Sequence, residues 1–600
     1  MNPLTDYRIQ QCTDYRRRLG ATFVPGEGVH TRLWAPDVGK AQIIWNGGEP
    51  SPLDSSEGYF TGHFPDRGPG DKYMYVLDGK TSPDPASRYQ PEDVFGPSAV
   101  VATEYGWQDA AWKGIPYGEW VIYEVHAGAF SSRHDFQGII EDLPRLKSLG
   151  ITTIELMPVS QFSGARNWGY DGVFPHAVQH SYGGPQALKA LVDACHAAGL
   201  AIILDVVYNH LGPEGNTLFA CGPYTNEKYT IPWGVALNFD GPENDHVRHY
   251  FLQTVWQWLT EYHFDGLRLD AVQMIFDNAP ITFLEEVSRL KTAAEERMGR
   301  PLILIAESDM NDPRLLAAPD QNGHGMDAQW ADDFHHALHV TLTGEKDGYY
   351  ADYGGTAQLA RIYREGVAFA GDYSPFRRRR HGKSYHGIAR NRLIAELQNH
   401  DQVGNRLKGD RVDQLITQGR SKLAAAAVLL SPFTPLIFMG EEFASKQPFS
   451  YFVSHHSKKL LEAMREGRKK EWEAFGWRDE APDPGAPETF EACVLHDKVP
   501  APDSPGDDMF QWYKSLIALS REIRLWDLGV HHDAGQDLIV LRYRKDRAEV
   551  TALLNFGEQP ATHQFEYDAG AVILNSRRAD APVENGIVTL QPYSVLVYRK

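Results

Sequence analysis

Eight short apolar runs, each followed by a stretch with helical periodicity, are the feature of this 600-residue chain that most limits its fold. Strands that alternate with helices in this way form a parallel sheet with crossover helices. Eight such units close into a (β/α)8 TIM barrel, so the sequence predicts an α/β fold of that type. The predicted strands are WVIYEVHAG, ITTIELMPV, LAIILDVVYNH, FDGLRLDAV, PLILIAES, MDAQWADDF, LIAELQNHD and TPLIFMGEE.

The segments on either side of these units look entirely β. Short runs such as HTRLWAP and KYMYVLDG are separated by the turn-forming GEG and RGPGDK, which is typical of a β-sandwich. We therefore expect an N-terminal β-sandwich at 1–105, the barrel at 106–526 and a small C-terminal β-sheet domain at 527–600. Two segments, 337–390 and 444–507, are expected to extend the loops after the sixth and eighth strands, where loops shape substrate choice.

Charge and hydropathy exclude several function classes. Acidic residues outnumber basic ones by 79 to 59, and no basic stripe is present, so we expect no nucleic-acid partner. No segment is apolar for long enough to span a bilayer, and the first residues lack the apolar core of a signal peptide. We therefore expect no membrane partner and a cytoplasmic location. The four cysteines are too scattered for a disulfide framework and are predicted to be free thiols.

Three acidic residues stand at or just beyond the carboxyl ends of predicted strands: Asp270, Glu307 and Asp401. A carboxylate beside buried apolar surface loses hydration, which is costly unless the group is paired or used. Barrel enzymes place their catalytic residues at this end of the strands. We therefore expect the three carboxylates to form an active site.

The neighbours of the three carboxylates predict different roles for them. Arg268 and Asp270 are two residues apart on a strand, so both face the barrel interior and the guanidinium keeps the carboxylate ionised, as a nucleophile requires. A structural ion pair is the alternative explanation. Glu307 has no arginine or lysine within two positions, so its pKa is expected to be raised, which suits a general acid. Asp401 lies in a polar turn and is expected to stay charged. These are the groups needed to cleave a glycoside with retention of configuration.

Four ordered motifs resemble the signature regions of the α-amylase family, glycoside hydrolase family 13. They are DVVYNH at 205–210, GLRLDAV at 266–272, the strand that ends at Glu307, and QNHD at 398–401. The resemblance implies retention of configuration. It also implies Asp270 as the nucleophile, Glu307 as the acid/base and Asp401 as the stabiliser of the transition state.

The same resemblance implies which residues contact the sugar on the nonreducing side of the cleaved bond: Tyr170, His210, Arg268 and His400. Asp205 and Asn209 would hold the loop after the third strand. In many relatives the residue equivalent to Asn209 helps to bind calcium. The loop that follows it here is short and lacks a cluster of oxygen ligands, so we expect no metal and no cofactor.

Within this family the segments WADDFHHALHV and EGRKKEW resemble members that hydrolyse the α-1,4 bond between a maltooligosaccharide and a terminal trehalose, releasing trehalose. The N-terminal sandwich is similar to the carbohydrate-binding-like module of such enzymes. The resemblance implies maltooligosyltrehalose as substrate and the synthase that forms it as a pathway partner. Candidate contacts on the trehalose side are Asp333, His335, His336 and Asn405, although a hydrogen-bonded core pair explains the two histidines nearly as well.

Two other functions stay open from the sequence. A glycogen branching enzyme would share the N-terminal module, the barrel and the carboxylates, but it would pass the glycosyl group to another glucan. A noncatalytic carbohydrate-binding barrel is less favoured, because all three carboxylates are present.

Overall fold

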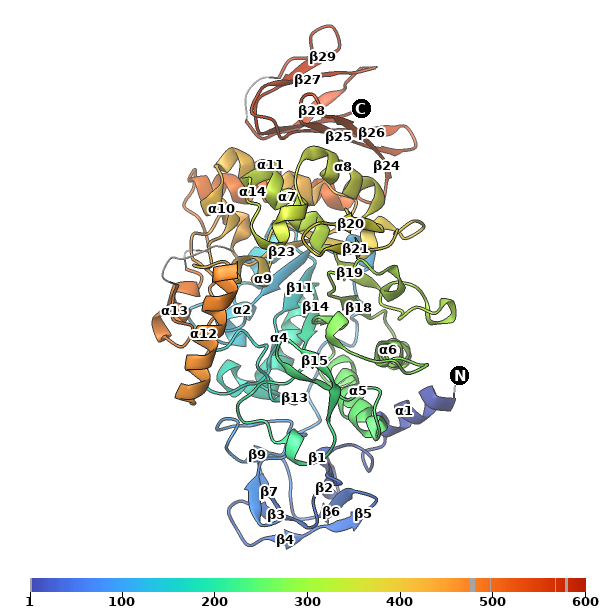
Figure 1. Cartoon of the computed structure of the whole chain (residues 1–600), viewed down its shortest axis with the longest axis vertical. Helices are drawn as coiled ribbons and strands as arrows, with labels where there is room; N and C mark the ends of the chain where they lie inside the picture. Colours follow the sequence, from blue (N-terminus) through green and yellow to red (C-terminus); the bar gives the residue numbers. More distant parts are fainter. Residues whose placement is uncertain (1–2, 475–480, 497, 567, 578–580) are drawn as a thin grey trace.

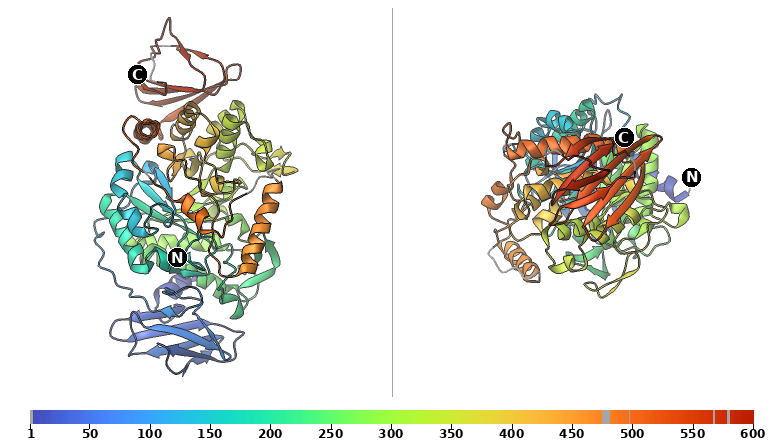
Figure 2. Two further views of the ribbon diagram at one scale, coloured as in Figure 1. Left: turned by 90° about the vertical axis from the view of Figure 1, so that its left-hand side faces the viewer. Right: turned by 90° about the horizontal axis from the view of Figure 1, so that it is seen from above.

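The molecule is elongated, with the barrel between two sets of β-sheets (Figure 1). The computed structural model describes residues 3–474, 481–496, 498–566, 568–577 and 581–600. The N-terminal sheets lie at one end of the long axis and the C-terminal sheets lie at the other. The left-hand view of Figure 2 shows the same order, and the right-hand view looks down onto the C-terminal sheets.

The centre of the fold is a closed barrel in which all eight predicted strands are present and pair in parallel, as predicted. Every strand residue is buried, because helices cover the outside and side chains fill the inside, which explains the continuous apolar runs. Ile203, Ile305 and Ile394 belong to a cluster separate from the main core. In chain order the strands are β10 (Ile122–Val125), β11 (Thr153–Leu156), β14 (Ala201–Val206), β17 (Gly266–Leu269), β18 (Ile303–Ala306), β19 (Ala328–Trp330), β22 (Leu393–Glu396) and β23 (Thr434–Phe438).

Helices surround the barrel and bury their apolar faces against it. Helix α6 is a clear case: Thr282 caps its first turn by accepting from the N–H of Glu285, and Gly299 ends it with φ 65°. In α5, Trp256 and Trp258 are buried in the core, so they pack and do not form a sugar platform. The larger helices are α3 (Leu143–Leu149), α4 (Gly184–Ala198), α5 (Asn244–Thr260), α6 (Phe283–Met298), α7 (Asp332–Thr343), α8 (Thr356–Glu365), α11 (Gln418–Leu429) and α14 (Pro505–Ile523).

The two segments predicted to be long loops contain regular structure. The first includes the second half of α7, helix α8 and a hairpin of β20 (Asp372–Ser374) and β21 (Arg379–His381). The second carries α12 (Lys458–Ala474) and α13 (Pro487–Cys493). Both therefore present side chains from ordered elements.

The N-terminal part contains two antiparallel sheets whose inner side chains join the main core. One sheet has the order β1 (Gly20–Val24), β2 (Gly28–Trp34), β6 (Tyr59–Phe64), β5 (Asp54–Ser56). The other contains β4 (Ser51–Pro52), β3 (Ala41–Trp45), β7 (Lys72–Leu77) and β8 (Lys80–Ser82), with β9 (Ser98–Ala99) also on β7.

A helix that the sequence did not predict, α1 (Pro3–Thr13), precedes these sheets and packs on α5 and α6 of the barrel. Its Arg8 is buried and donates to Glu286 at 2.8 Å. The chain therefore contacts the barrel before it enters the sandwich. The exact domain boundary stays a prediction.

The C-terminal part also consists of antiparallel sheets. The larger has the order β24 (Asp527–Asp533), β25 (Leu538–Lys545), β26 (Ala548–Asn555), β30 (Ser594–Arg599), β28 (Ala571–Asn575), and β27 (Ala561–Gln564) pairs with β29 (Ile587–Leu590). The larger sheet is fixed to the barrel by the hydroxyl of Tyr543 in β25, which donates to the carbonyl of Leu430 at 2.7 Å. All four cysteines are buried and free, as predicted. In the described ranges no helix is long and apolar enough to cross a membrane.

Candidate active site

One buried guanidinium, that of Arg268, joins three carboxylates at the carboxyl ends of the barrel strands. Its Nη1 lies 2.9 Å from Asp270 Oδ1 and 2.7 Å from Asp205 Oδ2, and its Nη2 lies 2.9 Å from Glu307 Oε2. Asp270 follows the last residue of β17, and Glu307 follows the last residue of β18. The predicted nucleophile and the predicted acid therefore lie around one cation. The face of Trp330 covers that cation at 4.1 Å.

The carboxylate of Asp270 is held from two sides. Arg268 binds Oδ1, and the amide of Asn209 donates to Oδ2 at 2.7 Å and to the main-chain carbonyl at 2.8 Å. The side chain keeps 11% of its surface exposed, so it is fixed yet accessible. Asn209 was expected to hold only its own loop. In the structure it also orients the predicted nucleophile.

Glu307 has a raised pKa, as the sequence predicted. Burial is the largest cause; Arg268 lowers the pKa, while the charges of Asp270, Asp401 and Asp332 raise it. The arginine contact was not foreseen, because Arg268 lies 39 positions away in the sequence. The N–H of Ala271 donates to Glu307 Oε2 at 2.7 Å. Ala271 itself has φ 38°, a left-handed conformation that costs free energy and is found mostly at functional sites. Burial and neighbouring charges therefore raise the pKa of Glu307 even though two donors contact its Oε2.

Asp401 is the most open of the three carboxylates, with 44% of its side chain exposed. It sits in the first turn of the short helix α9 (His400–Gly404), whose cap, Asn399, accepts from the N–H of Gln402 at 2.9 Å. Asn405 donates to Asp401 Oδ1 at 3.3 Å and accepts from Arg468 of α12 at 2.8 Å. Asn405 therefore contacts the predicted stabiliser and links it to the segment after the eighth strand.

Tyr170 and His400 lie face to face beside the carboxylates. Their ring centroids are 5.0 Å apart with an angle of 18°, and the Tyr170 hydroxyl donates to Asp205 at 2.6 Å. Glu124, from β10, accepts from both the ring Nδ1 and the main-chain N–H of His400. Burial lowers the pKa of His400, but Glu124 and Asp401 raise it, and the net pKa is raised. Glu124 was not identified from the sequence, because it lies on a strand without a signature motif.

His210 lies next to the main chain of Tyr170 and stacks against Trp233, with centroids 4.7 Å apart at 21°. Trp233 is 53% exposed, in the turn between β15 (Thr225–Ile231) and β16 (Gly234–Leu237). Burial lowers the pKa of His210 against the opposing effects of Asp270 and Asp171, so this ring is neutral near pH 7. The only sequence signal for Trp233 is a lone tryptophan in the turn PWG.

The candidates from α7 have buried partners of their own. Asp333 accepts from Asn311 and from the N–H groups of Ala368 and Phe369 on one oxygen and from the Tyr353 hydroxyl on the other. It thereby fixes the segment around 368–369. None of these four hydrogen-bond partners is one of the three carboxylates.

His335 and His336 are buried in the same region. His335 contacts the carbonyl of Leu397 at 2.7 Å and the hydroxyl of Tyr350 at 3.2 Å. His336 packs between Tyr349 and Tyr353, and burial lowers its pKa to about 3. The hydrogen bonds of His335 match the alternative of a hydrogen-bonded core residue, whereas the buried Nδ1 of His336 has no hydrogen-bond partner in the described residues.

Asp332, one residue before Asp333, is a group that the sequence analysis missed. It is half-buried at the start of α7. Burial and the charges of Asp309, Asp333 and Asp401 raise its pKa to about 7. Its charge in turn raises the pKa of Glu307. The signal was available, since Asp332 comes almost directly after the sixth strand.

In the described part of the chain no group of three or more histidine, cysteine, aspartate or glutamate side chains is arranged to hold a metal. The amide nitrogen of Asn209 donates to Asp270, and its oxygen, the atom that a cation would need, contacts the ring of His210. The absence of a metal and of a cofactor stays a prediction.

Several known proteins are similar to this chain. Residues 109–228 match the model described as alpha amylase, catalytic domain. A malto-oligosyltrehalose trehalohydrolase from Saccharolobus solfataricus is 44% identical over 83% of this chain and 86% of its own length. One from Rhizobium sp. (strain M-11) is 42% identical over 94% and 97%. A 1,4-alpha-glucan branching enzyme from Bacillus caldolyticus is 30% identical but covers only 52% of this chain and 53% of its own length.

Solved structures extend the likeness to the whole fold. A putative alpha amylase from Salmonella typhimurium is 36% identical, with a TM-score of 0.88 over 97% of this chain and 99% of its own. A pullulanase from Paenibacillus barengoltzii has a TM-score of 0.70 over 100% and 97% at 20% identity, a likeness that concerns the fold alone.

Proposed function

The chain belongs to the malto-oligosyltrehalose trehalohydrolases of the α-amylase family, and from that premise we propose how its barrel carries out the reaction. It is a glycosidase that hydrolyses the α-1,4 bond between a maltooligosaccharide and a terminal trehalose, releasing trehalose.

The first step forms a covalent intermediate. Asp270 attacks the anomeric carbon on the nonreducing side of the bond while protonated Glu307 gives its proton to the glycosidic oxygen. The carbon–oxygen bond breaks, trehalose leaves, and the maltooligosyl group stays as an ester on Asp270. Water then attacks the same carbon, Glu307 takes its proton, and the ester bond breaks to release the maltooligosaccharide with retained configuration.

The contacts of Arg268 are the observation that carries this proposal. One guanidinium contacts both Asp270 and Glu307 from a buried position. It pairs with Oδ1 of the proposed nucleophile, while burial and the neighbouring carboxylates raise the pKa of Glu307 against the opposing effect of the same guanidinium. Asp401 stabilises the positive charge that develops on the flattened ring.

The remaining site residues position the sugar. Tyr170, stacked on His400, forms the platform for the ring, and His210 borders the ring next to Tyr170. On the trehalose side, Asn405 acts through its hydrogen bond to Asp401. For Asp333, His335 and His336 the buried contacts favour a structural role over contact with sugar.

Two wider expectations rest on the family alone. The synthase that forms maltooligosyltrehalose is the proposed pathway partner, because this enzyme consumes its product. The N-terminal sandwich is proposed to be a carbohydrate-binding-like module. Independently of the family, a cytoplasmic location is proposed from the sequence.

Product analysis tests the reaction. Purified protein incubated with maltopentaosyl trehalose is expected to release trehalose and a maltooligosaccharide, which chromatography separates. Incubation with amylose is expected to give no new α-1,6 branches. Branch formation without trehalose release would identify the alternative, a branching enzyme.

Asp270→Asn tests the nucleophile. Removing it is expected to lower kcat by about three orders of magnitude or more while leaving substrate binding in place. The matched control is Asp320→Asn, which removes an exposed carboxylate that makes none of the contacts described for the site. It is expected to leave kcat unchanged. Wild-type turnover by Asp270→Asn would contradict the assignment.

A further inference from the structure

One face of helix α12 packs inward, and it carries a single arginine. Leu460, Leu461, Met464 and Arg468 are half-buried, at the spacing of one side of a helix. The other basic residues of the helix are exposed: Lys458, Lys459, Arg465, Lys469 and Lys470. Figure 1 and Figure 2 both show α12, in orange, beside the barrel. The helix therefore directs one positive charge toward the barrel.

Asn405 lies between this charge and the predicted stabiliser. Nη1 of Arg468 donates to Asn405 Oδ1 at 2.8 Å, and Asn405 Nδ2 donates to Asp401 Oδ1 at 3.3 Å. A guanidinium has only donors, and an ionised carboxylate has only acceptors. The amide therefore satisfies both neighbours in one orientation alone, with its oxygen toward Arg468 and its nitrogen toward Asp401.

The Arg468 guanidinium also lies over two aromatic rings. Its Cζ is 4.3 Å from the ring centre of Tyr451 and 5.9 Å from that of Trp168, distances at which a ring attracts a cation. Trp168 meets the ring of His400 edge to face, with centroids 5.7 Å apart at 87°. Helix α9 packs closely on Trp168, since a Cβ on Gly404 would lie 1.9 Å from its Cζ2. The arginine is thus fixed against the wall that supports α9.

The Asp401 carboxylate has few partners of its own. In the described part of the chain, Asn405 is the one residue that donates a hydrogen bond to it, and His400 Nε2 lies 3.8 Å from Oδ1. A side chain that is open to solvent and held by one bond rotates between staggered conformers unless that partner is fixed. The position of Asp401 therefore depends on what holds Asn405.

We propose that Arg468 is a positioning residue of the active site. It holds the Asn405 amide by its oxygen, so that the amide nitrogen keeps Asp401 where positive charge develops on the sugar ring. The role given to Arg468 rests on the proposed function, in which Asp401 stabilises that charge. Through α12, the segment after β23 thereby supports the site from outside the barrel.

Steady-state kinetics of Arg468→Met on maltopentaosyl trehalose test this role. Methionine keeps an unbranched apolar stem but has no donor. We expect kcat to fall about tenfold and KM to change less than about threefold, because a misplaced stabiliser acts mainly on the transition state. Arg468→Lys keeps a charged donor for this single contact and is expected to retain kcat within about threefold of the wild type. A wild-type kcat in Arg468→Met would overturn the proposal.

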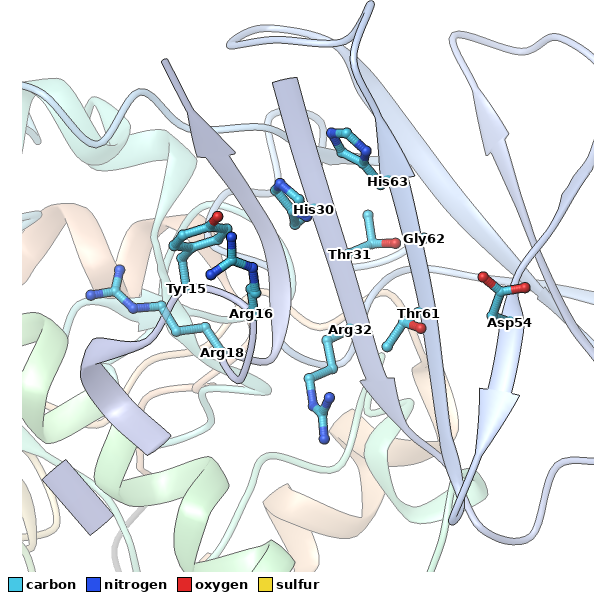
Figure 3. Close-up of a pocket in the computed structure, with 10 residues that line it drawn as sticks. All are labelled: Tyr15, Arg16, Arg18, His30, Thr31, Arg32, Asp54, Thr61, Gly62 and His63. Atoms are coloured by element: carbon cyan, nitrogen blue, oxygen red, sulfur yellow. The ribbon is translucent and has the colours of Figure 1, made fainter. Parts of the chain in front are cut away.

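Two controls remove an arginine elsewhere. Arg465→Met lies on the same helix and breaks an exposed ion pair with Asp483 at 2.8 Å. Arg16→Met lies in the N-terminal part, where Figure 3 shows the side chain beside a hollow; like Arg468, it lies over a tyrosine ring, at 4.5 Å. Each is expected to change kcat less than about twofold. An equal loss in Arg465→Met would attribute the effect to displacement of α12 and overturn the proposal.

A double-mutant cycle tests whether Arg468 acts through Asn405. Asn405→Ala is expected to lower kcat about tenfold by itself. If the arginine acts through the amide, adding Arg468→Met is expected to lower kcat by less than about twofold more. Independent action would multiply the two losses to about a hundredfold, and that result would overturn the proposal. Thermal denaturation checks that each variant is folded.

A crystal structure of Arg468→Met separates this role from the proposed function. The Asn405 amide is expected to turn away from Asp401 once its oxygen has lost its donor. An amide that still donates to Asp401 would overturn the proposal, whatever substrate the enzyme hydrolyses. Failure of the wild type to release trehalose would instead contradict the proposed function.

Discussion

At the scale of single residues, the site depends on buried charges that are shared between neighbours. Arg268 serves three carboxylates, and Glu124 holds one histidine through both its ring and its main chain. Breaking such a pair leaves the other charge buried and unpaired, which is costly. Substitution of residues that touch no substrate is therefore expected to change catalysis.

Glu124→Gln tests this at His400. Glutamine keeps the size of the side chain and an acceptor for the main-chain N–H, but it cannot neutralise the imidazolium. The raised pKa of His400 depends on Glu124, so the variant lowers that pKa and the ring loses its proton at lower pH. We expect kcat to fall and the alkaline arm of the pH–rate profile to move to lower pH.

The control for this experiment is Glu141→Gln, which changes a glutamate whose side chain is 55% exposed. It is expected to keep both kcat and the pH profile. A purely structural role for Glu124 would lower the melting temperature of Glu124→Gln without moving the alkaline arm, and that result would contradict the assignment.

At the scale of elements, the short helix α9 positions Asp401. A helix of five residues gains little from its own hydrogen bonds, so its cap and its packing keep it in place. The cap is Asn399, which precedes the catalytic residue by two positions. The placement of Asp401 therefore depends on one side-chain hydrogen bond at the start of the helix.

Asn399→Ala is expected to lower stability by about 1 kcal/mol through loss of the cap. It is also expected to lower kcat by roughly tenfold to a hundredfold, because a small misplacement of a catalytic group is costly. Asn399→Ser retains a capping oxygen and is expected to restore both. Denaturant unfolding and steady-state kinetics provide the measurements. Full activity in Asn399→Ala would show that packing alone holds α9.

At the scale of the whole molecule, the connection between the sandwich and the barrel is fixed by stacked rings. Trp107 stacks on His263 with centroids 3.9 Å apart, and Trp112 stacks on His196 at 4.7 Å. The two ring nitrogens of His196 lie 2.9 Å from Asp109 and 3.0 Å from Asp265. Both nitrogens can donate only when the ring is protonated, so a buried imidazolium joins the connection to the barrel.

This contact predicts how stability depends on pH. Burial lowers the pKa of His196, but Asp109 and Asp265 raise it, and the net pKa is raised. The stabilisation is therefore complete below the unfolded value of about 6.5 and is lost as the pH rises through the folded value. Burial raises the pKa of Asp109, but His196 and His263 lower it to about 2. The stabilisation that the Asp109 carboxylate contributes is therefore lost only as the pH falls toward 2.

The measurement is the difference in melting temperature between the wild type and His196→Gln. We expect this difference to be largest near pH 5 to 6 and to shrink toward pH 9. His386→Gln, a change at an exposed histidine, provides the control and is expected to give no such trend. A difference that grows with pH would contradict a protonated His196.

The sequence by itself determined the barrel and the three carboxylates. The period, the length and the apolar content of the eight runs can be read directly from the order of the residues. They follow from the local geometry of a strand and from its burial on both faces. Asp270, Glu307 and Asp401 were identifiable because each stands near a strand end, a position set by the chain alone.

Only the tertiary structure decided which side chains meet. Arg268 reaches Glu307, Glu124 reaches His400 and Trp233 reaches His210 across large sequence separations, and no local pattern encodes such contacts. The same holds for α7, where Asp332 and Asp333 are adjacent yet one lies among the active-site charges and the other inside a hydrogen-bonded core. Helix rotation and packing set that difference. They are properties of the closed barrel and cannot be read from two neighbouring aspartates.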